Sequence, residues 1–308
     1  MRCLVICLLC ISRVASADPA SCVAGDAFDK TEMHDQLAFL ASKELDGRAP
    51  GSDGDAKTVA FIEDRFACLG LTPGGEVGGF REAFTTQGVV THNVIGYLPG
   101  IDPNVGSEIV IVSAHHDHLG DGHLGANDDA SGIVAMLAIA KAMSQGEPPK
   151  RTIVFAAFGA EEGGMIGSGY YAKQLASTLP IGNVVQFVEL DMVGSHNSDD
   201  LVAAMGAFKG FGARTLLDKH LKEFPKIHVS AGGKARGSDF QPFCELGVPY
   251  TFFWTPDHRC YHERCDTIDH IDLPHMLDIT KLAGMLVRDL GDTDLDLAGL
   301  RAHKGCGV

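Results

Sequence analysis

The sequence predicts an α/β fold with a mixed, largely parallel central sheet and helices on both of its faces. Two observations predict it: nearly continuous apolar runs of strand length recur along the chain, and helical patterns lie between them. Strands of this kind that alternate with helices are typical of sheets buried between two helical layers. The length of 308 residues, 45% of them hydrophobic and 21% charged, suits one large α/β domain or two small ones.

The elements follow from apolar spacing, taken in chain order. Residues 33–69 have the pattern of two helices separated by an irregular stretch, residues 45–51, and Gly70 is the expected stop of the second helix. The apolar residues that mark one face of that helix are Val59, Phe61, Ile62 and Phe66. Strands are expected at 94–98, 109–114, 153–158, 184–190 and 250–254. Further helices are expected at 132–143, 211–224 and 274–290.

The first seventeen residues have the pattern of a secretory signal peptide. A basic start at Met1-Arg2 precedes an apolar run over residues 3–11 and an A-x-A site that ends at Ala17. The run is too short to cross a membrane as a helix. We therefore expect cleavage after Ala17 and a secreted or periplasmic protein. The mature chain would comprise an N-terminal segment or propeptide (18–32), a single domain (33–291) and a tail (292–308) that is either docked through Cys306 or mobile.

The cysteine count fits an exported chain. Nine cysteines, less the three at positions 3, 7 and 10, leave six in the mature chain. An even number in an exported protein suggests disulfides, although six cysteines allow fifteen pairings. Cys260 and Cys265 are close in sequence, whereas the partners of Cys22, Cys68, Cys244 and Cys306 stay open.

The net charge and the later apolar runs limit the partners. A formal charge of −15 argues against nucleic acid or an anionic membrane, because both would repel the chain. No run after the first seventeen residues is long and apolar enough to serve as a membrane anchor, so we expect a soluble mature protein. The sequence does not determine the oligomeric state.

Polar residues follow the predicted strands directly, where ligand sites of such sheets lie. Taken alone, each has an ordinary explanation: Asp128 as a helix cap, Asp191 as a turn residue, the acidic pair as solvated surface. Together, at successive strand ends, they indicate a metal site. The residues concerned are His115 and Asp117 after the second strand, Asp128 at the start of a helix, Glu161 and Glu162 after the third strand, Asp191 after the fourth and His262 after the last.

The ligand types select the metal. Mixed imidazole and carboxylate ligation suits zinc, with cobalt or manganese as alternatives. Five ligands exceed the three that a single catalytic zinc uses. Two ions that share one carboxylate fit the number better, and such pairs lie about 3.5–4 Å apart.

At these motifs the sequence resembles the M28 family of zinc peptidases, which includes bacterial leucine-type aminopeptidases. The resemblance runs from about Leu37 to Asp269 and implies a zinc-exopeptidase (phosphorylase/hydrolase-like) fold. The motifs are His-x-Asp, Gly-Ala-Asn-Asp-Asp, Glu-Glu, Leu-Asp-Met and Tyr-His-x-x-x-Asp-Thr. The resemblance implies that His115 and Asp191 hold one zinc, that Glu162 and His262 hold the other, and that Asp128 bridges them. It also implies that Glu161 is the general base and that Asp117 orients the first histidine ligand.

The resemblance predicts a reaction and a substrate class. Two zinc ions would activate a water molecule, Glu161 would take its proton and pass it to the leaving amine, and a peptide would lose its N-terminal residue. Tyr261 is a candidate for contacting the oxyanion. A Cys260–Cys265 disulfide would fix the turn that carries His262, as in some secreted members of the family.

Several neighbouring residues and rival functions stay open. His116, His118 and His123 are interpreted as loop or supporting residues, and Arg236 and Asp239 as parts of a solvated loop rather than as substrate contacts. The rival functions are a carboxypeptidase or dipeptidase, a one-zinc enzyme resembling glutaminyl cyclase, and a binding protein of the same fold without metal. The absence of Gly-x-Ser-x-Gly and His-Glu-x-x-His argues against a serine hydrolase and a one-zinc helical protease.

Overall fold

The computed structural model describes residues 22–195, 200–256, 259–301 and 306. In this part of the chain nine strands form one sheet in the order β1-β3-β5-β4-β6-β9-β7-β8, and β2 pairs with β3 beside that path. The signal peptide expected at residues 1–17 lies outside the described residues.

The strands and helices have the following bounds. The strands are β1 (Thr72–Pro73), β2 (Arg81–Thr86), β3 (Val89–Leu98), β4 (Ile109–His115), β5 (Thr152–Phe158), β6 (Val184–Leu190), β7 (Leu201–Met205), β8 (His228–Ala231) and β9 (Tyr250–Trp254). The helices are α2 (Lys30–Leu40), α3 (Asp53–Cys68), α4 (Ser131–Gln145), α5 (Ile166–Thr178), α6 (Gly212–His220), α7 (Phe240–Glu245), α8 (Leu273–Asp292) and α9 (Leu297–Arg301).

The sheet is mixed, as the sequence predicts. Strand β4 is parallel to β5 and β6, β6 is parallel to β9, and β7 is parallel to β8. The antiparallel pairs lie toward the edges, where β3 meets β1, β2 and β5, and where β7 meets β9. Every residue of β4 and β6 is buried, which explains why their sequences are apolar without alternation.

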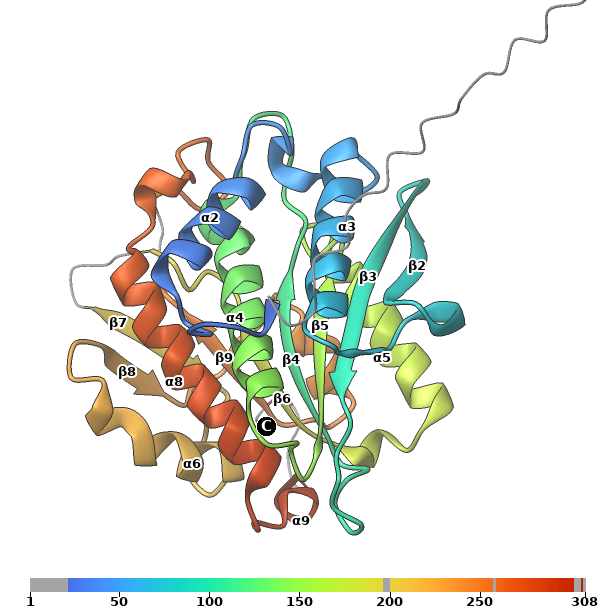
Figure 1. The fold of residues 1–308 in the computed structure, drawn as a ribbon, viewed down its shortest axis with the longest axis vertical. Helices are drawn as coiled ribbons and strands as arrows, with labels where there is room; N and C mark the ends of the chain where they lie inside the picture. Colours follow the sequence, from blue (N-terminus) through green and yellow to red (C-terminus); the bar gives the residue numbers. More distant parts are fainter. Residues whose placement is uncertain (1–21, 196–199, 257–258, 302–305, 307–308) are drawn as a thin grey trace, which may run out of the picture.

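Helices cover both faces of the sheet, which confirms the predicted architecture. Helices α2, α3, α4 and α8 lie across the face that is turned toward the viewer in Figure 1. They share one apolar core with that side of the strands. Helices α5 and α7 pack on the other face, where Tyr171, Phe240 and Phe243 join a second apolar cluster with Phe158 and Phe187.

The helix boundaries follow from capping side chains. The Ser52 hydroxyl accepts a hydrogen bond from Asp55 N at the start of α3, and Gly70 at φ +71° follows its end, as predicted. Helix α2 starts three residues before the expected Met33 because the Asp29 carboxylate caps it by accepting from Glu32 N. The helix expected at 211–224 ends earlier, at His220, and continues as a 3₁₀ turn.

Two disulfides tie distant parts of the described chain together, and a third closes a short loop. Cys22 bonds to Cys68 at the end of α3, Cys244 bonds to Cys306, and Cys260 bonds to Cys265 as expected. The Cys244–Cys306 bond and helix α9 show that the tail is docked. Disulfides persist in oxidising compartments, so the three pairs indicate an extracellular or periplasmic protein. Among the described residues, no helix combines the length and apolar character needed to span a bilayer.

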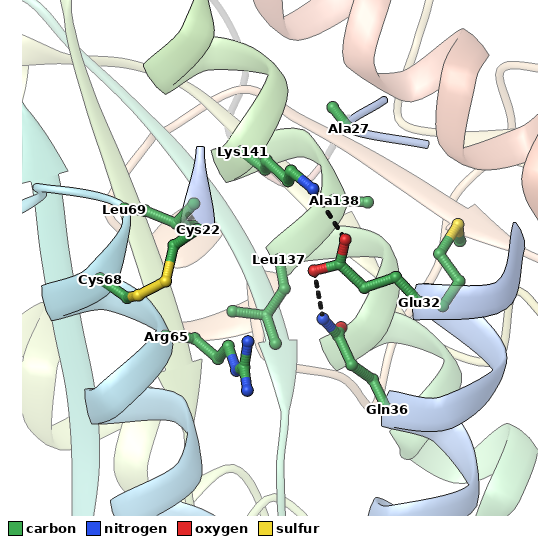
Figure 2. A pocket seen from close by; sticks show the side chains of 11 residues that line it. Cys22, Ala27, Glu32, Gln36, Arg65, Cys68, Leu69, Leu137, Ala138 and Lys141 are labelled. Carbon is green, nitrogen blue, oxygen red and sulfur yellow. Dashed lines mark hydrogen bonds and ion pairs between the residues drawn. A yellow bond between two sulfur atoms is a disulfide. The ribbon is translucent and has the colours of Figure 1, made fainter. Parts of the chain in front are cut away.

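Figure 2 shows the surroundings of the Cys22–Cys68 disulfide. Here the structure encloses a cavity of about 20 Å³ between α2, α3 and α4. Beside it, Lys141 Nζ of α4 donates to Glu32 Oε2 of α2 at 2.7 Å, and Gln36 Nε2 donates to the other oxygen of Glu32 at 3.2 Å. Glu32, Gln36 and Lys141 are thus paired with one another.

Candidate metal centre

The five predicted ligands lie together at one edge of the sheet. Each stands at or after the carboxyl end of a central strand, or in the turn that opens α4, as expected for a site in this fold. His115 ends β4, Asp128 lies in the turn before α4, Glu162 follows β5, Asp191 follows β6 and His262 follows β9.

Asp128 lies between two groups of ligand atoms. Its Oδ1 is 3.1 Å from His115 Nε2, and its Oδ2 is 3.3 Å from His262 Nε2. His115 Nε2 is also 3.7 Å from Asp191 Oδ1, and His262 Nε2 is 2.9 Å from Glu162 Oε2. We call His115, Asp128 and Asp191 the first ligand group, and Asp128, Glu162 and His262 the second. One carboxylate therefore has an oxygen in each group.

A third histidine faces the second ligand group. His118 Nδ1 lies 2.6 Å from Glu162 Oε1 and 3.9 Å from Asp128 Oδ2, and its side chain is fully buried. The sequence interpretation gave it no direct ligand role. His116 is also buried, but its Nε2 lies 2.9 Å from the carbonyl of His92, away from the ligands. His123 contacts the carbonyl of Gly120 in its own loop.

Asp117 organises the backbone beneath both groups. Its carboxylate accepts hydrogen bonds from Glu161 N at 3.0 Å and Glu162 N at 3.3 Å. His115 Nδ1 lies closer to the Asp117 carbonyl oxygen, at 3.1 Å, than to its carboxylate, at 3.7 Å. Asp117 thus contacts His115 chiefly through its main chain, and its carboxylate holds the turn that carries the acidic pair.

Two further carboxylates fix the turn that presents Asp128. Asp266 accepts from Asn127 N at 2.8 Å and from Asp128 N at 3.0 Å. Asp129 accepts from the backbone N–H groups of His115, Gly132 and Met192, so it joins the ends of β4 and β6 to α4. Sequence reasoning assigned neither role, although Asp266 belongs to the quoted Tyr-His-x-x-x-Asp-Thr motif.

Ser238 and Arg48 also hold parts of the candidate site in place. The Ser238 hydroxyl lies 2.6 Å from Asp191 Oδ2 and 2.7 Å from Glu189 Oε1. Arg48, which is fully buried, donates to the carbonyls of Leu40, His116, Leu124 and Gly125 at 2.7–2.9 Å. It therefore anchors both ends of the loop between His115 and Asp128. No short sequence motif marks Arg48, because its partners are main-chain atoms far away in the chain.

Burial and mutual repulsion shift the pKa values of this acidic cluster. Burial, with repulsion from Asp239 and Asp191, raises the pKa of Glu161 to about 10, although His115 opposes the shift. Burial likewise raises the pKa of Asp239 to about 7. For His115, burial would lower the pKa, but the Asp117, Asp128 and Asp191 carboxylates raise it well above its ordinary value. The acidic groups of the cluster thus outnumber the histidines that can neutralise them.

A cavity of about 400 Å³ opens onto the ligands. Glu161 lines it, and so do the exposed side chains of Lys234, Arg236 and Tyr261. Its apolar walls are formed by Met192, Met205, Phe252 and Trp254. The interpretation of Asp239 as a solvated loop residue is wrong: it is fully buried, because Phe240 beside it begins α7 and packs into the core.

The residues fit a pair of zinc ions. Asp128 Oδ2 is buried and accepts no hydrogen bond within the described part of the chain, although imidazole nitrogens surround it. A buried carboxylate oxygen of this kind requires a cation or a proton. The donor set of imidazoles and carboxylates is that of zinc. His115, Asp128 and Asp191 would hold one ion, and Asp128, Glu162 and His262 the other.

The turn that carries His262 is held by the Cys260–Cys265 disulfide. His262 itself has a positive φ of 59°, and so do Ala160 before the acidic pair (57°) and Met192 after Asp191 (58°). Non-glycine residues seldom adopt this conformation, and those that do gather at functional sites. Three of the four strand ends thus turn sharply to present their ligands.

This fold, with two candidate ligand groups around a shared carboxylate at its strand ends, is typical of metal-dependent hydrolases. A sequence model described as "Peptidase family M28" matches residues 93–287, more than half of the chain. The chain belongs to this family.

Curated relatives agree with that assignment. Leupeptin-inactivating enzyme 1 of Streptomyces exfoliatus is 28% identical over 77% of this chain and 56% of its own length. The probable leucine aminopeptidase 2 of Aspergillus oryzae is 37% identical over 77% of this chain and 50% of its own length. The chain thus spans about half the length of these relatives.

Solved structures share the fold. The zinc aminopeptidase BSAP of Bacillus subtilis superposes with a TM-score of 0.73 at 17% identity, over 89% of this chain and 98% of that one. The glutaminyl cyclase of Porphyromonas gingivalis superposes with a TM-score of 0.70 at 15% identity, over 86% of this chain and all of that one. Proteins of different activity thus share this fold, so the activity has to be argued from the site.

Proposed function

We propose that this protein is a two-zinc exopeptidase that releases N-terminal amino acids from peptides. The proposal rests on the position of Asp128 between the two ligand groups. Its Oδ1 lies 3.1 Å from His115 Nε2 in the first group, and its Oδ2 lies 3.3 Å from His262 Nε2 in the second. Family membership supports a peptidase, and the names of the relatives support action at the amino end. An enzyme that binds one zinc ion would need only one of the two ligand groups.

Glu161 is the general base in this proposal. When bound, the zinc ions lower the pKa of a water molecule and polarise the peptide carbonyl. The Glu161 carboxylate lines the cavity, and its own N–H is held by Asp117. It takes a proton from the attacking water and returns it to the leaving amine. Glu162, its neighbour, belongs to the second ligand group, where it would bind the metal ion. Tyr261 lines the same cavity and is the candidate partner for the carbonyl oxygen.

The walls of the cavity favour an apolar terminal side chain. Met192, Met205, Phe252 and Trp254 offer apolar surface beside Glu161 and the ligands. An apolar pocket discriminates between side chains by about 1–3 kcal/mol per methylene group. We therefore expect leucine, methionine or phenylalanine at the amino end to be preferred over glycine or aspartate.

A carboxypeptidase or dipeptidase is the second candidate. Lys234 and Arg236, two exposed cations, line the cavity, and either would pair with a substrate carboxylate. An aminopeptidase does not require them.

The deciding experiment compares leucyl-anilide with N-acetyl-leucyl-anilide and with free and amidated dipeptides. We expect cleavage of the free-amine anilide, none of the acetylated one, and loss of activity in a chelator that zinc restores. Activity confined to dipeptides with a free carboxylate, lost in Arg236→Gln, would replace the aminopeptidase with the second candidate. Cyclisation of an N-terminal glutamine with no hydrolysis would indicate a glutaminyl cyclase instead.

We also infer that residues 1–17 direct export and are removed after Ala17. The three disulfides of the described chain support an oxidising destination. The N-terminal sequence of the protein recovered from the medium or periplasm tests this: a start at Asp18 supports it, and a start near Met33 would show that residues 18–32 are a propeptide.

A further inference from the structure

One histidine nitrogen that is not among the five predicted ligands lies beside the second ligand group. We propose that His118 Nδ1 is a fourth protein ligand of the ion held by Asp128, Glu162 and His262. The two metal positions then differ: one is closed by four side chains, and the other is bound by three and keeps a free position. This inference rests on the proposed function, since it requires a metal ion in the second group.

The distances suit a four-ligand zinc position. Zinc binds nitrogen and oxygen at about 2.0–2.2 Å, so two ligands on one ion lie no more than about 4.4 Å apart. His118 Nδ1 lies 2.6 Å from Glu162 Oε1 and 3.9 Å from Asp128 Oδ2. His262 Nε2 lies 2.9 Å from Glu162 Oε2 and 3.3 Å from Asp128 Oδ2. These four separations, each between an imidazole nitrogen and a carboxylate oxygen, fall within the limit.

The surroundings of His118 leave it no other polar role. Its side chain is fully buried, and its Nε2 has no hydrogen-bond partner within the described part of the chain. All the polar contacts of the ring are therefore at Nδ1, which faces Glu162 and Asp128. A histidine placed only to hydrogen-bond Glu162 need not approach Asp128 Oδ2, whereas a ligand of the same ion must. That oxygen is itself buried without a hydrogen bond.

The inference separates the tasks of the two ions. Closed zinc positions with four protein ligands are typical of structural sites, and open ones with three are typical of catalytic sites. The position of His115, Asp128 and Asp191 is then the one with room for substrate, and it borders the cavity. The closed position should bind its ion more tightly.

The first test compares zinc binding by the metal-free wild-type protein, His118→Asn and His123→Asn, with free zinc set by chelator buffers. Asparagine places an amide where Nδ1 stood, so it can still donate to Glu162 but is a poor zinc ligand. His123 controls for loss of a histidine in the same loop, since its ring nitrogen Nδ1 lies against the Gly120 carbonyl and not against a ligand. We expect two binding steps in the wild type, and a tighter step weakened about 10–100-fold or more in His118→Asn alone. Wild-type affinities in His118→Asn would overturn the inference.

A second measurement needs no variant. Zinc X-ray absorption of the wild-type protein with two ions bound should count three imidazoles shared by the two ions (His115, His118 and His262). A count of two would overturn the role of His118 and leave the two-zinc proposal standing. Failure of the wild type to bind a second ion would overturn the proposed function itself, so the two failures are distinguishable.

Discussion

Two regions of this molecule bury charge in opposite ways. At the strand ends, Asp128, Glu161, Asp191 and Asp239 crowd together, and burial and repulsion raise the pKa of Glu161 to about 10. On the helical side, two buried cations have carboxylate partners: Lys141 pairs with Glu32 at 2.7 Å (Figure 2), and Arg151 pairs with Glu108 at 2.6 Å.

The difference distinguishes charged groups that serve the candidate site from charged groups that stabilise the fold. Buried charge that the fold neutralises itself holds segments in place, as Arg151 does by donating to Glu108 and to carbonyls of the chain after α8. Buried charge without an internal partner costs stability unless something from outside the chain, such as a cation, offsets it. The crowded carboxylates at the strand ends would therefore be stabilised by a bound cation, whereas Lys141 and Arg151 already have carboxylate partners. Each prediction below acts on one region and should leave the other unchanged.

The largest effect should come from Glu161→Gln. The amide keeps the size of the side chain but removes the proton acceptor, so we expect kcat to fall by about 10²–10⁴-fold. Zinc content and unfolding midpoint should stay close to wild type, because Glu161 belongs to neither ligand group. Glu263→Gln, which changes an exposed glutamate in the loop of His262, is the matched control. If Glu161→Gln kept more than half of the activity, the role of Glu161 as base would be wrong.

Arg151→Met should produce the largest loss of stability in the paired region. It removes the partner of Glu108 and leaves carbonyls without a donor, which costs about 3 kcal/mol of unfolding free energy. Urea denaturation measures this loss. Lys150→Met, which breaks the exposed ion pair with Asp294, should cost much less unfolding free energy than Arg151→Met. Equal losses in the two variants would contradict the contrast between buried and exposed pairs.

Removal of metal should destabilise the strand-end cluster. An ion that binds only the folded chain adds about 2.7 kcal/mol at a concentration one hundred times its dissociation constant. For a domain of this size, chelation should lower the melting temperature by several degrees, as differential scanning calorimetry would detect. The shift should be the same in Lys150→Met. A melting temperature that chelator leaves unchanged would mean that no ion stabilises the cluster.

The smallest effect concerns His220, a partly exposed histidine between α6 and α8. Burial would lower its pKa, but Glu223 and Asp289 raise it, while Lys219 also contacts Asp289. Since the pKa is higher in the folded state, its contribution is complete below pH about 6.5 and is lost as the pH rises through the folded value. His220→Gln should therefore lower stability by up to about 1 kcal/mol at pH 6 and by little at pH 9. If His220→Gln lost more stability at pH 9 than at pH 6, the predicted direction of the pH dependence would be wrong.

The central strands could be predicted, and the candidate ligands could be placed beside their ends, because local sequence determines both. The runs that form β4, β5, β6 and β9 are largely apolar, so burial on both faces shows in the sequence itself. The polar residue that follows each run then lies at the ligand edge by topology alone.

The elements that were missed carry weaker patterns. Strand β8 is a short edge strand with exposed positions, and helix α5 contains two glycines and has no strong apolar stripe. Strand β7 is only five residues long, too short for its alternating burial to stand out.

The supporting residues of the site were hidden for a different reason. Arg48, Asp239 and His118 take their roles from contacts with chain segments far away in sequence. The partners of Arg48 are carbonyls, which every residue possesses. The burial of Asp239 depends on the core packing of α7, and His118 stands one residue after a recognised motif. Only the fold shows that its ring turns toward Glu162 and Asp128.

The candidate ligands lie far apart in the sequence, so the ribosome makes them at different times. His115 and His262 are 147 positions apart, so a ribosome that adds about 5–20 residues per second makes the first about 7–30 seconds before the last. During this interval the first ligand group can be completed, because its last member is Asp191, but the second group still lacks His262. An ion in the second group would therefore show that the chain has been made and folded at least as far as the loop after β9.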